Sequence, residues 1–354
     1  MGNSLARLIA LYLPQFHPIP ENDAWWGKGF TEWTNTAKAR PLFPGHYQPH
    51  VPADLGFYDL RVPETRAAQA DLAREYGIEA FCYYHYWFAG RRIIERPFNE
   101  VLVSGQPDFP FCLCWANQTW TGIWHGAADR ILIEQTYPGV DDHRAHFETL
   151  LPAFRDRRHV TVEGKPLFVI YRPLEIPEIA KVARLWREMA VAAGLPGLYL
   201  VGAQQLADPA ELGLDASTTG HLPDRRPWVS KRRPIQWLRS KYREARGRPT
   251  VYRYEDVIDQ IWPEVVSGVV DFPCLIPNWD NTPRSGKNGL VLQHSTPDLF
   301  RRHARQVIER IRDRPRESNL VFIKSWNEWA EGNHLEPDLK FGRRYLEVLR
   351  DEFS

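Results

Sequence analysis

The chain has 354 residues and a formal net charge of +1, with 43% apolar and 25% charged residues, a composition typical of a globular protein. A net charge this close to zero gives no support for a nucleic-acid partner or a strongly acidic one, and we expect neither. The sequence also lacks a run of about 18 apolar residues, the length that a membrane-spanning helix needs.

Eight short apolar, β-rich runs alternate with helical patterns along the chain. The predicted strands are 7–13, 78–86, 110–116, 166–171, 198–203, 213–217, 272–277 and 320–326. The predicted helices are 63–77, 141–157, 176–194, 254–266, 297–313 and 342–353. Because most of these strands are continuously apolar, they predict a parallel sheet that is buried on both faces.

Eight strand–helix units predict an α/β fold, a single-domain (β/α)8 TIM-type barrel over residues 1–354. The sixth strand, 213–217, is weak, so a doubly wound open sheet stays an alternative. The four cysteines lie in the apolar runs, and we expect them to be free and buried rather than in disulfides or a zinc site. They are Cys82, Cys112, Cys114 and Cys274.

One segment departs from the balanced charge of the rest. Residues 224–248 hold ten Arg or Lys against two acidic residues, and we treat residues 221–253 as a basic insertion within the barrel. A solvated surface segment is one interpretation, and a patch for anionic lipid or a phosphate-bearing substrate is the other. The N-terminus lacks the apolar region and cleavage site of an export signal, so we expect a cytoplasmic protein, with a peripheral position at the inner membrane as the alternative.

Polar and aromatic residues collect just after six of the predicted strands. They follow the first strand at 12–17, the second at 83–87, the third at 115–120, the fourth at 171–172, the seventh at 278–280 and the eighth at 326–329. In a barrel, the carboxyl ends of the strands form one face, where the chemistry takes place. These clusters therefore predict one shared site.

The stretch KSWNEWAEGNHLEP, residues 324–337, places Glu328 and Glu331 three residues apart among tryptophans. Residues i and i+3 of a helical turn lie about 5–6 Å apart at Cβ, which suits a pair of carboxyls acting on a glycosidic bond. Burial beside Trp326 and Trp329 would raise the pKa of one carboxyl toward the role of an acid. The alternative is a helix-capping pattern with exposed glutamates.

Several long motifs resemble those of the WbsX family, which is associated with bacterial O-antigen and capsule loci and is related to glycoside hydrolase family 99. The motifs are LYLPQFH (11–17), FTEW (30–33), YGIEAFCYYHYWF (76–88), FCLCWANQTW (111–120), KPLFVIYRP (165–173) and SWNEWAEGNHLEP (325–337). The resemblance covers roughly residues 5–350 and weakens across the basic insertion.

The resemblance implies a metal-independent (β/α)8 enzyme of the retaining endo-α-mannosidase type, with no cofactor. It implies that Glu328 draws the proton from the sugar 2-hydroxyl, whose oxygen attacks the anomeric carbon to give a 1,2-anhydro sugar. Glu331 would protonate the leaving oxygen and then activate the incoming hydroxyl. The first- and second-strand motifs are of the WbsX type rather than of family 99 proper, so mannose specificity does not carry over with the glutamates.

Other residues near the strand ends are predicted sugar contacts, through hydrogen bonds or ring stacking. They are Tyr12, His17, Tyr84, His85, Trp87, Trp115, Asn117, Tyr171, Trp326, Asn327, Trp329 and His334. Each is also consistent with a supporting or core position. A metal site built from His17, His50, His85 and His125 is not expected, because no short histidine spacing joins them.

We therefore expect an oligo- or polysaccharide partner, which the basic insertion would allow to be lipid-linked. A glycosyltransferase is the main alternative, although the chain contains neither Asp-x-Asp nor a G-x-G-x-x-G after a strand. A non-catalytic glycan-binding protein is the third interpretation, and it would not need both glutamates.

Overall fold

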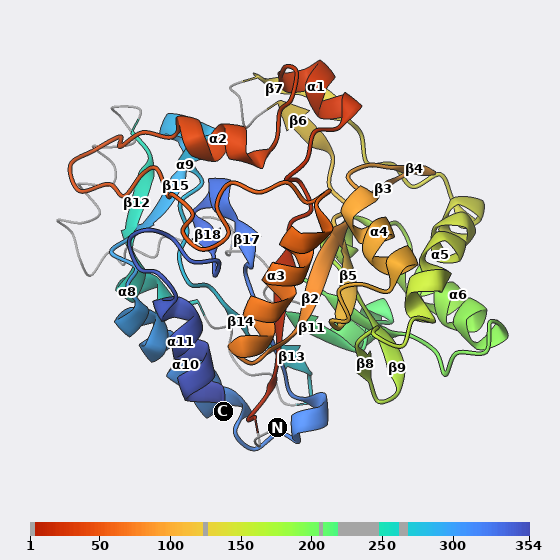
Figure 1. Cartoon of the computed structure of the whole chain (residues 1–354). Helices are drawn as coiled ribbons and strands as arrows, with labels where there is room; N and C mark the ends of the chain where they lie inside the picture. The colour runs from red at the N-terminus through yellow and green to blue at the C-terminus, as the bar shows by residue number, and fades with distance from the viewer. Residues whose placement is uncertain (1–3, 123–126, 205–207, 219–247, 262–267) are drawn as a thin grey trace.

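The computed structural model describes residues 4–122, 127–204, 208–218, 248–261 and 268–354. At its centre is a parallel sheet with the strand order β13-β11-β10-β9-β5-β2-β1-β16-β14 (Figure 1). The strands are β1 (Arg7–Tyr12), β2 (Ile78–His85), β5 (Phe111–Trp115), β9 (Lys165–Ile170), β10 (Tyr199–Gly202), β11 (Ala216–Thr218), β13 (Asp271–Phe272), β14 (Cys274–Leu275) and β16 (Leu320–Ile323).

The sheet closes through one segment, residues 271–275, which Pro273 divides into β13 and β14. β13 pairs with β11 on one side, and β14 pairs with β16 on the other, both in parallel. Proline has no N–H to donate, so the break falls where the ladder loses a donor, while the Pro273 carbonyl still accepts the N–H of Phe322. Counting this segment as one strand gives the eight strands of a (β/α)8 barrel and confirms the predicted fold class.

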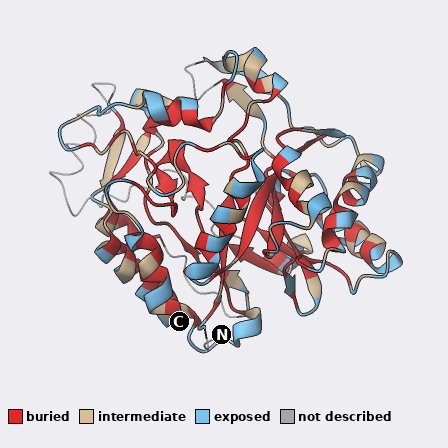
Figure 2. Cartoon of the chain, viewed as in Figure 1, coloured by how far each residue is buried: buried red, intermediate tan, exposed pale blue. Residues whose placement is uncertain are grey.

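The strands form where the sequence is continuously apolar, and every residue of β5 and β16 is buried. Helices cover the outer face of the barrel and turn their apolar sides toward it (Figure 2). They are α3 (Pro63–Glu75), α4 (Arg96–Ser104), α5 (Val140–Phe154), α6 (Ile179–Ala192), α8 (Tyr254–Ile258), α10 (Pro297–Ile311) and α11 (Arg344–Phe353). All four cysteines are free and buried, as predicted.

Helix α10 illustrates how sequence sets these boundaries. The Thr296 side chain accepts the N–H of Leu299, and Pro297 occupies the first helical position, where no N–H is needed. Phe300, Ala304 and Val307 then recur at helical spacing and are fully buried.

Irregular elements that the periodicity did not predict lie over the end of the barrel opposite the termini (Figure 1). They are α1 (Pro20–Trp26), α2 (Glu32–Lys38), α9 (Thr282–Ser285) and the paired strands β3–β4 (Trp87–Phe88, Arg91–Arg92), β6–β7 (Trp120–Gly122, Ala127–Ile133), β12–β15 (Thr250–Arg253, Leu290–Gln293) and β17–β18 (Asn327–Glu328, Asn333–His334). A two-residue β8 (Thr161–Val162) also pairs with β9.

Most of the predicted basic insertion lies outside the described residues, and its last four residues form β12. Predicted helix 254–266 is described only to residue 261, and α8 ends at Ile258. Across the described residues, no helix combines the length and the apolar character needed to cross a membrane.

Candidate active site

A cleft of about 410 Å³ opens at the carboxyl ends of the barrel strands. Such ends meet at one face of a barrel, so the residues that follow β1, β2, β5, β9, β14 and β16 come together there. The lining residues are Leu13, Gln15, Trp26, Phe30, Glu32, Asn35, Tyr84, Tyr86, Ala116, Gln118, Thr119, Trp120, Thr121, Leu132, Tyr171, Arg172, Trp279, Arg284, Lys324, Glu328 and Glu331. Both predicted catalytic glutamates are among them.

The two glutamates lie on a short hairpin that follows β16. Glu328 ends β17, Trp329–Glu331 form a single 3₁₀ turn, and Gly332 turns the chain into β18 with φ +54°. A Cβ at position 332 would lie 2.9 Å from the Asp280 Cβ, so only glycine fits this turn. The pair therefore shares one tight turn, and its exposures of 4% and 7% contradict the alternative of exposed capping glutamates.

Buried hydrogen bonds fix this hairpin to the barrel. The Asn327 side chain accepts the N–H of Leu13 at 2.7 Å and donates to the Leu13 carbonyl at 3.0 Å, which ties β17 to the end of β1. The Ser325 hydroxyl accepts the N–H of Glu328 at 2.9 Å and donates to the Asn333 carbonyl at 2.7 Å. Since all five residues are buried, the position of Glu328 is set by the fold rather than by solvent.

A second anchor acts through Glu336, which accepts hydrogen bonds from Trp329 Nε1 at 2.6 Å, Tyr58 OH at 2.9 Å and Gln69 Nε2 at 2.6 Å. Burial raises the pKa of Glu336 to about 7, against the opposing effect of these donors. The anchor joins the 3₁₀ turn to α3 and to the segment before it.

Glu328 is held as a carboxylate. Lys324 Nζ lies 3.0 Å from its Oε1, and Tyr84 OH donates to the same oxygen at 3.0 Å. Burial alone would raise the pKa of Glu328, but the Lys324 ammonium and the Arg284 guanidinium outweigh burial and lower it to about 2. Both contacts fall on Oε1, and the Glu328 carboxyl also hydrogen-bonds to the Glu331 carboxyl.

Glu331 has the opposite character. Burial and the nearby negative charge of Glu328 raise its pKa to about 8, although Arg284 and Lys324 oppose the shift. Arg284 Nη1 contacts Oε1 at 2.6 Å, and Oε2 is buried. Lys324 Nζ lies 3.0 Å from Glu328 Oε1 and 3.9 Å from Glu331 Oε2, so these two oxygens are at most 6.9 Å apart.

Three charged residues of this centre were not predicted from the sequence. Lys324 is the last polar residue of an otherwise apolar strand, a position where a buried lysine signals a nearby acid. Arg284 and Glu32 come from α9 and α2, far apart in sequence, and Arg284 Nε donates to Glu32 Oε1 at 2.8 Å. Nothing in the local sequence around either residue signals this contact.

Of the predicted sugar contacts, Tyr84 and Tyr171 line the cleft. Asn117 lies just behind it, where its amide donates to Tyr137 OH at 2.9 Å and to the Arg172 carbonyl at 2.8 Å. Asn327 is fully occupied by the contacts to Leu13. These two residues shape the wall rather than line it.

Five other predicted contacts face the surrounding helices and loops. Tyr12 OH donates to Gln69 of α3 at 2.8 Å, and His17 Nδ1 lies 3.1 Å from the Pro14 carbonyl. His85 Nε2 lies 2.9 Å from His146 Nε2 of α5. The other two also pack against His146, with ring centroids 4.8 Å and 4.6 Å away; they are Trp87 and Trp115.

The last three predicted contacts lie in or beside the hairpin and contribute to its packing. Trp326 is fully buried and packs on Phe81 with centroids 5.0 Å apart. Trp329 stacks on His334 at 3.8 Å, and neither lines the cleft. The cleft takes more of its aromatic surface from Tyr86, Trp120 and Trp279, which lie in the predicted strand-end clusters without being named as sugar contacts, and from Trp26 and Phe30, which lie outside those clusters.

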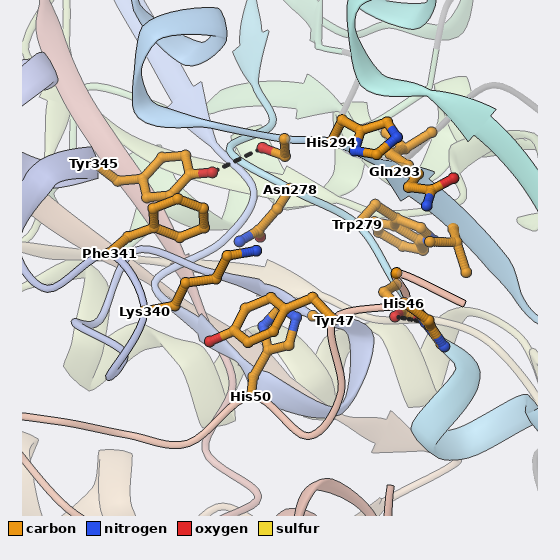
Figure 3. A pocket seen from close by; sticks show the side chains of 16 residues that line it. His46, Tyr47, His50, Asn278, Trp279, Gln293, His294, Lys340, Phe341 and Tyr345 are labelled. Atoms are coloured by element: carbon orange, nitrogen blue, oxygen red, sulfur yellow. Dashed lines mark hydrogen bonds and ion pairs between the residues drawn. The ribbon is translucent and has the colours of Figure 1, made fainter. Parts of the chain in front are cut away.

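A smaller cavity of about 70 Å³ lies beside the hairpin (Figure 3). His50 Nδ1 lies 2.8 Å from His334 Nε2, and these two residues and Asp338 place possible metal-ligand atoms within 4.8 Å of one another. Tyr47 OH donates to Asp338 at 2.9 Å, and Lys340 Nζ lies 4.1 Å from the Tyr47 ring centroid. The positive charge of the nearby Lys340 ammonium disfavours a metal cation at His50, His334 and Asp338. We therefore interpret these three residues as part of a hydrogen-bonded network.

The histidines considered together for a metal do not meet. His17, His50 and His85 each have the separate neighbours given above, and His125 lies outside the described residues.

Comparisons with known proteins agree with this architecture. The family model described as "Glycosyltransferase WbsX" matches residues 8–349. The protein WxcX of Xanthomonas campestris pv. campestris strain B100 is 39% identical over 352 residues, which are 99% of this chain and 50% of that protein. WxcX of strain ATCC 33913 matches to the same extent, so the chain spans about half the length of these relatives.

Solved structures with a similar fold have low sequence identity. A "Glycoside hydrolase-like protein" is 16% identical with a TM-score of 0.59, covering 100% of this chain and 95% of that one. The GH99 endo-alpha-mannosidase from Bacteroides thetaiotaomicron is 15% identical with a TM-score of 0.55, covering 98% of this chain and 95% of that one. These likenesses establish the fold, and the family model, which matches residues 8–349, shows that the chain belongs to the WbsX family.

Proposed function

We propose that the chain is a carbohydrate-active enzyme, a retaining endo-glycosidase in which Glu331 is the general acid and base and Glu328 is the partner carboxylate. The observation that carries the proposal is a pair of buried carboxyls in one cleft with unlike neighbours: Lys324 and Tyr84 contact Glu328, whereas Arg284 contacts Glu331. Two titratable groups whose environments push their pKa values apart suit an acid and a base at the same pH.

The separation of the carboxyls supports a retaining reaction. Retaining glycosidases hold the two groups about 5–5.5 Å apart, whereas inverting enzymes need about 6.5–9.5 Å to fit a water between them. The Lys324 contacts limit the distance between Glu328 Oε1 and Glu331 Oε2 to at most 6.9 Å. Most of the range of distances that inverting enzymes use is larger than this limit.

In the first step, the 2-hydroxyl gives its proton to Glu328 while its oxygen attacks the anomeric carbon. The bond to the leaving oxygen breaks, and that oxygen takes the proton of Glu331. In the second step, water or a sugar hydroxyl gives its proton to Glu331 and attacks the anomeric carbon of the 1,2-anhydro sugar. Oxygen 2 then recovers its proton from Glu328. Lys324 and Tyr84 hold Glu328 in place throughout.

The aromatic lining supports a glycan as the substrate. Trp120, Trp279, Tyr84 and Tyr171 supply ring faces and hydroxyls on the walls around the glutamates. The cleft volume lies within the range of about 300–1,000 Å³ that is usual for small-molecule sites. We propose a bacterial surface polysaccharide or its lipid-linked precursor as the substrate, with membrane contact through the basic insertion as part of that proposal.

A glycosyltransferase is the second candidate, and the description of the family model is the observation that favours it. In that reaction the same cleft would bind an activated sugar donor, and Glu328, the carboxylate of the pair, would accept the proton of the attacking hydroxyl. A glycan-binding protein without activity is the third candidate.

A time course by NMR distinguishes the three. Purified protein is incubated with the surface polysaccharide of its source organism and with the lipid-linked precursor, without a nucleotide sugar, beside a Glu331→Gln sample. New reducing-end signals from the wild type alone support the glycosidase. New linkages that appear only after a nucleotide sugar is added favour the transferase, and binding without any new signal favours the glycan-binding protein.

A further inference from the structure

Arg284 is shared between two carboxyl groups at the floor of the cleft. Its Nη1 donates to Glu331 Oε1 at 2.6 Å, and its Nε donates to Glu32 Oε1 at 2.8 Å. The side chains are 14%, 9% and 2% exposed in the order Arg284, Glu331, Glu32, so water screens the contacts little. The guanidinium is thus held in a fixed fork between the proposed acid and a second, deeper acid.

Asp280 fixes the positions of Glu331 and Arg284 relative to each other. Its N–H donates to the Glu331 carbonyl at 2.6 Å, and its Oδ1 accepts the N–H and the hydroxyl of Thr282 at the start of α9. The turn that carries Glu331 and the turn that carries Arg284 are therefore connected through one residue. Glu32 is fixed independently on α2, where Thr31 and Thr34 form a capping box.

The two oxygens of Glu331 have different surroundings. Oε1 accepts a hydrogen bond from Arg284, whereas Oε2 is buried and lies 3.9 Å from Lys324 Nζ. The Glu331 carboxyl also hydrogen-bonds to Glu328. Oε1 is therefore the oxygen by which Arg284 holds the carboxyl.

Both positively and negatively charged side chains surround Glu331. Glu328 faces it from β17, Lys324 from the end of β16 and Arg284 from α9, with Glu32 behind Arg284 and the phenols of Tyr84 and Tyr171 nearby. An arginine devoted wholly to Glu331 would favour the carboxylate and strip it of its proton near neutral pH. Glu32 draws part of that guanidinium charge to itself.

We propose that Arg284, restrained by Glu32, is a positioning residue that holds Glu331 by Oε1 and balances the two protonation states that Glu331 passes through. This inference rests on the proposed function. In the first step the Glu331 proton leaves with the departing sugar oxygen, and Arg284 holds the resulting carboxylate. In the second step the incoming water or hydroxyl returns a proton to Glu331, and Glu32 keeps the arginine from opposing that return.

The test follows the Glu331 carboxyl directly by NMR, in protein labelled with ¹³C at the glutamate carboxyl, with the signal assigned by its loss in Glu331→Gln. Arg284→Gln removes the positive charge, and we expect the Glu331 titration to move to higher pH by about one unit or more. Glu32→Gln frees the arginine for Glu331, and we expect a shift to lower pH. Arg172→Gln removes an equal charge from the same cleft, and it should leave the titration nearly unchanged because Arg172 pairs with Glu175 rather than with Glu331.

Opposite shifts in Arg284→Gln and Glu32→Gln support the inference, and an unmoved titration in both overturns it. If Arg284→Gln does not fold, Glu32→Gln and Arg284→Lys provide the test. Lysine keeps the positive charge but lacks the planar guanidinium that contacts both carboxyl groups. That variant should titrate near the wild type but turn over more slowly. If the titrations move and the alkaline limb of kcat/KM stays in place, then Glu331 is not the reacting acid and the proposed function fails instead.

Discussion

Replacing Glu331 by glutamine should make the stability of the protein less sensitive to alkali, because the amide cannot lose a proton. The folded-state pKa of Glu331 is raised to about 8 from an ordinary value of 4.5. The folded state therefore keeps a proton between these values that the unfolded chain has lost. The stability that this proton contributes is complete below pH 4.5 and is lost as pH rises through the folded pKa.

The size of the effect follows from the shift. One pKa unit corresponds to about 1.4 kcal/mol, so the wild type should lose about 1.4 kcal/mol per pH unit relative to Glu331→Gln between pH 4.5 and 8. The limit over the whole window is roughly 4–5 kcal/mol. Arg284 loses an ionic partner in the variant, but it stays charged at every pH in this window, so that cost does not change the slope. Glu336 titrates in the same window in both proteins, so its contribution cancels.

Urea unfolding at pH 5, 6, 7, 8 and 9 measures the difference. Glu309→Gln is the matched control, since Glu309 is 70% exposed and its replacement should give a difference that does not vary with pH. We expect the free energy of unfolding of Glu331→Gln to gain on the wild type up to about pH 8 and then to run parallel to it. Parallel curves from pH 5 upward would show that Glu331 ionises normally in the folded protein, and the acid role would lose its basis.

Other changes test the remaining contacts of the centre. Lys324→Met removes the cation beside Glu328, so the pKa of that carboxyl should rise and the acidic limb of the pH–rate profile should move upward; an unmoved limb would show that Lys324 does not keep Glu328 ionised. Asn327→Ala leaves the buried N–H and carbonyl of Leu13 unpaired, at about 1–3 kcal/mol for each group; urea unfolding that gave a loss below 1 kcal/mol would contradict the anchor. Trp279→Ala should raise KM more than it lowers kcat, because it removes a wall and no reacting group, and an equal fall in kcat would argue against that placement. A 2-deoxy substrate analogue should resist cleavage, since the first step uses oxygen 2, and efficient cleavage would point to direct attack by Glu328.

The sequence was sufficient for the barrel because most of its strands are continuous apolar runs, and the weak sixth strand forms at Ala216–Thr218. The sequence was also sufficient to predict that Glu328 and Glu331 lie close together and are buried, because both stand among tryptophans in one short stretch. The irregular elements over the cleft were not predicted, because turns and short hairpins have no period. Arg284 and Glu32 meet only through tertiary contacts, which no local pattern records.

The predicted sugar contacts illustrate a different limit. Successive residues of a strand point to opposite faces, so Tyr84 and Tyr86 reach the cleft while Tyr83 and His85 turn toward the helices. The prediction that these residues cluster at the strand ends was correct. However, only every second side chain of a strand points into the cleft, and which ones do so depends on how the barrel closes. For the same reason, Tyr12 and Trp115 pack outward against α3 and α5.

The configuration of the first product most directly tests the pairing of Glu328 with Glu331. The wild type and Glu331→Gln are given the same glycan in deuterated buffer, and the anomeric proton of the new reducing end is recorded before mutarotation. Two carboxyls at most 6.9 Å apart that act in two steps predict the anomer of the substrate from the wild type, and no product from the variant. An inverted anomer, or cleavage that survives in Glu331→Gln, would contradict the pairing.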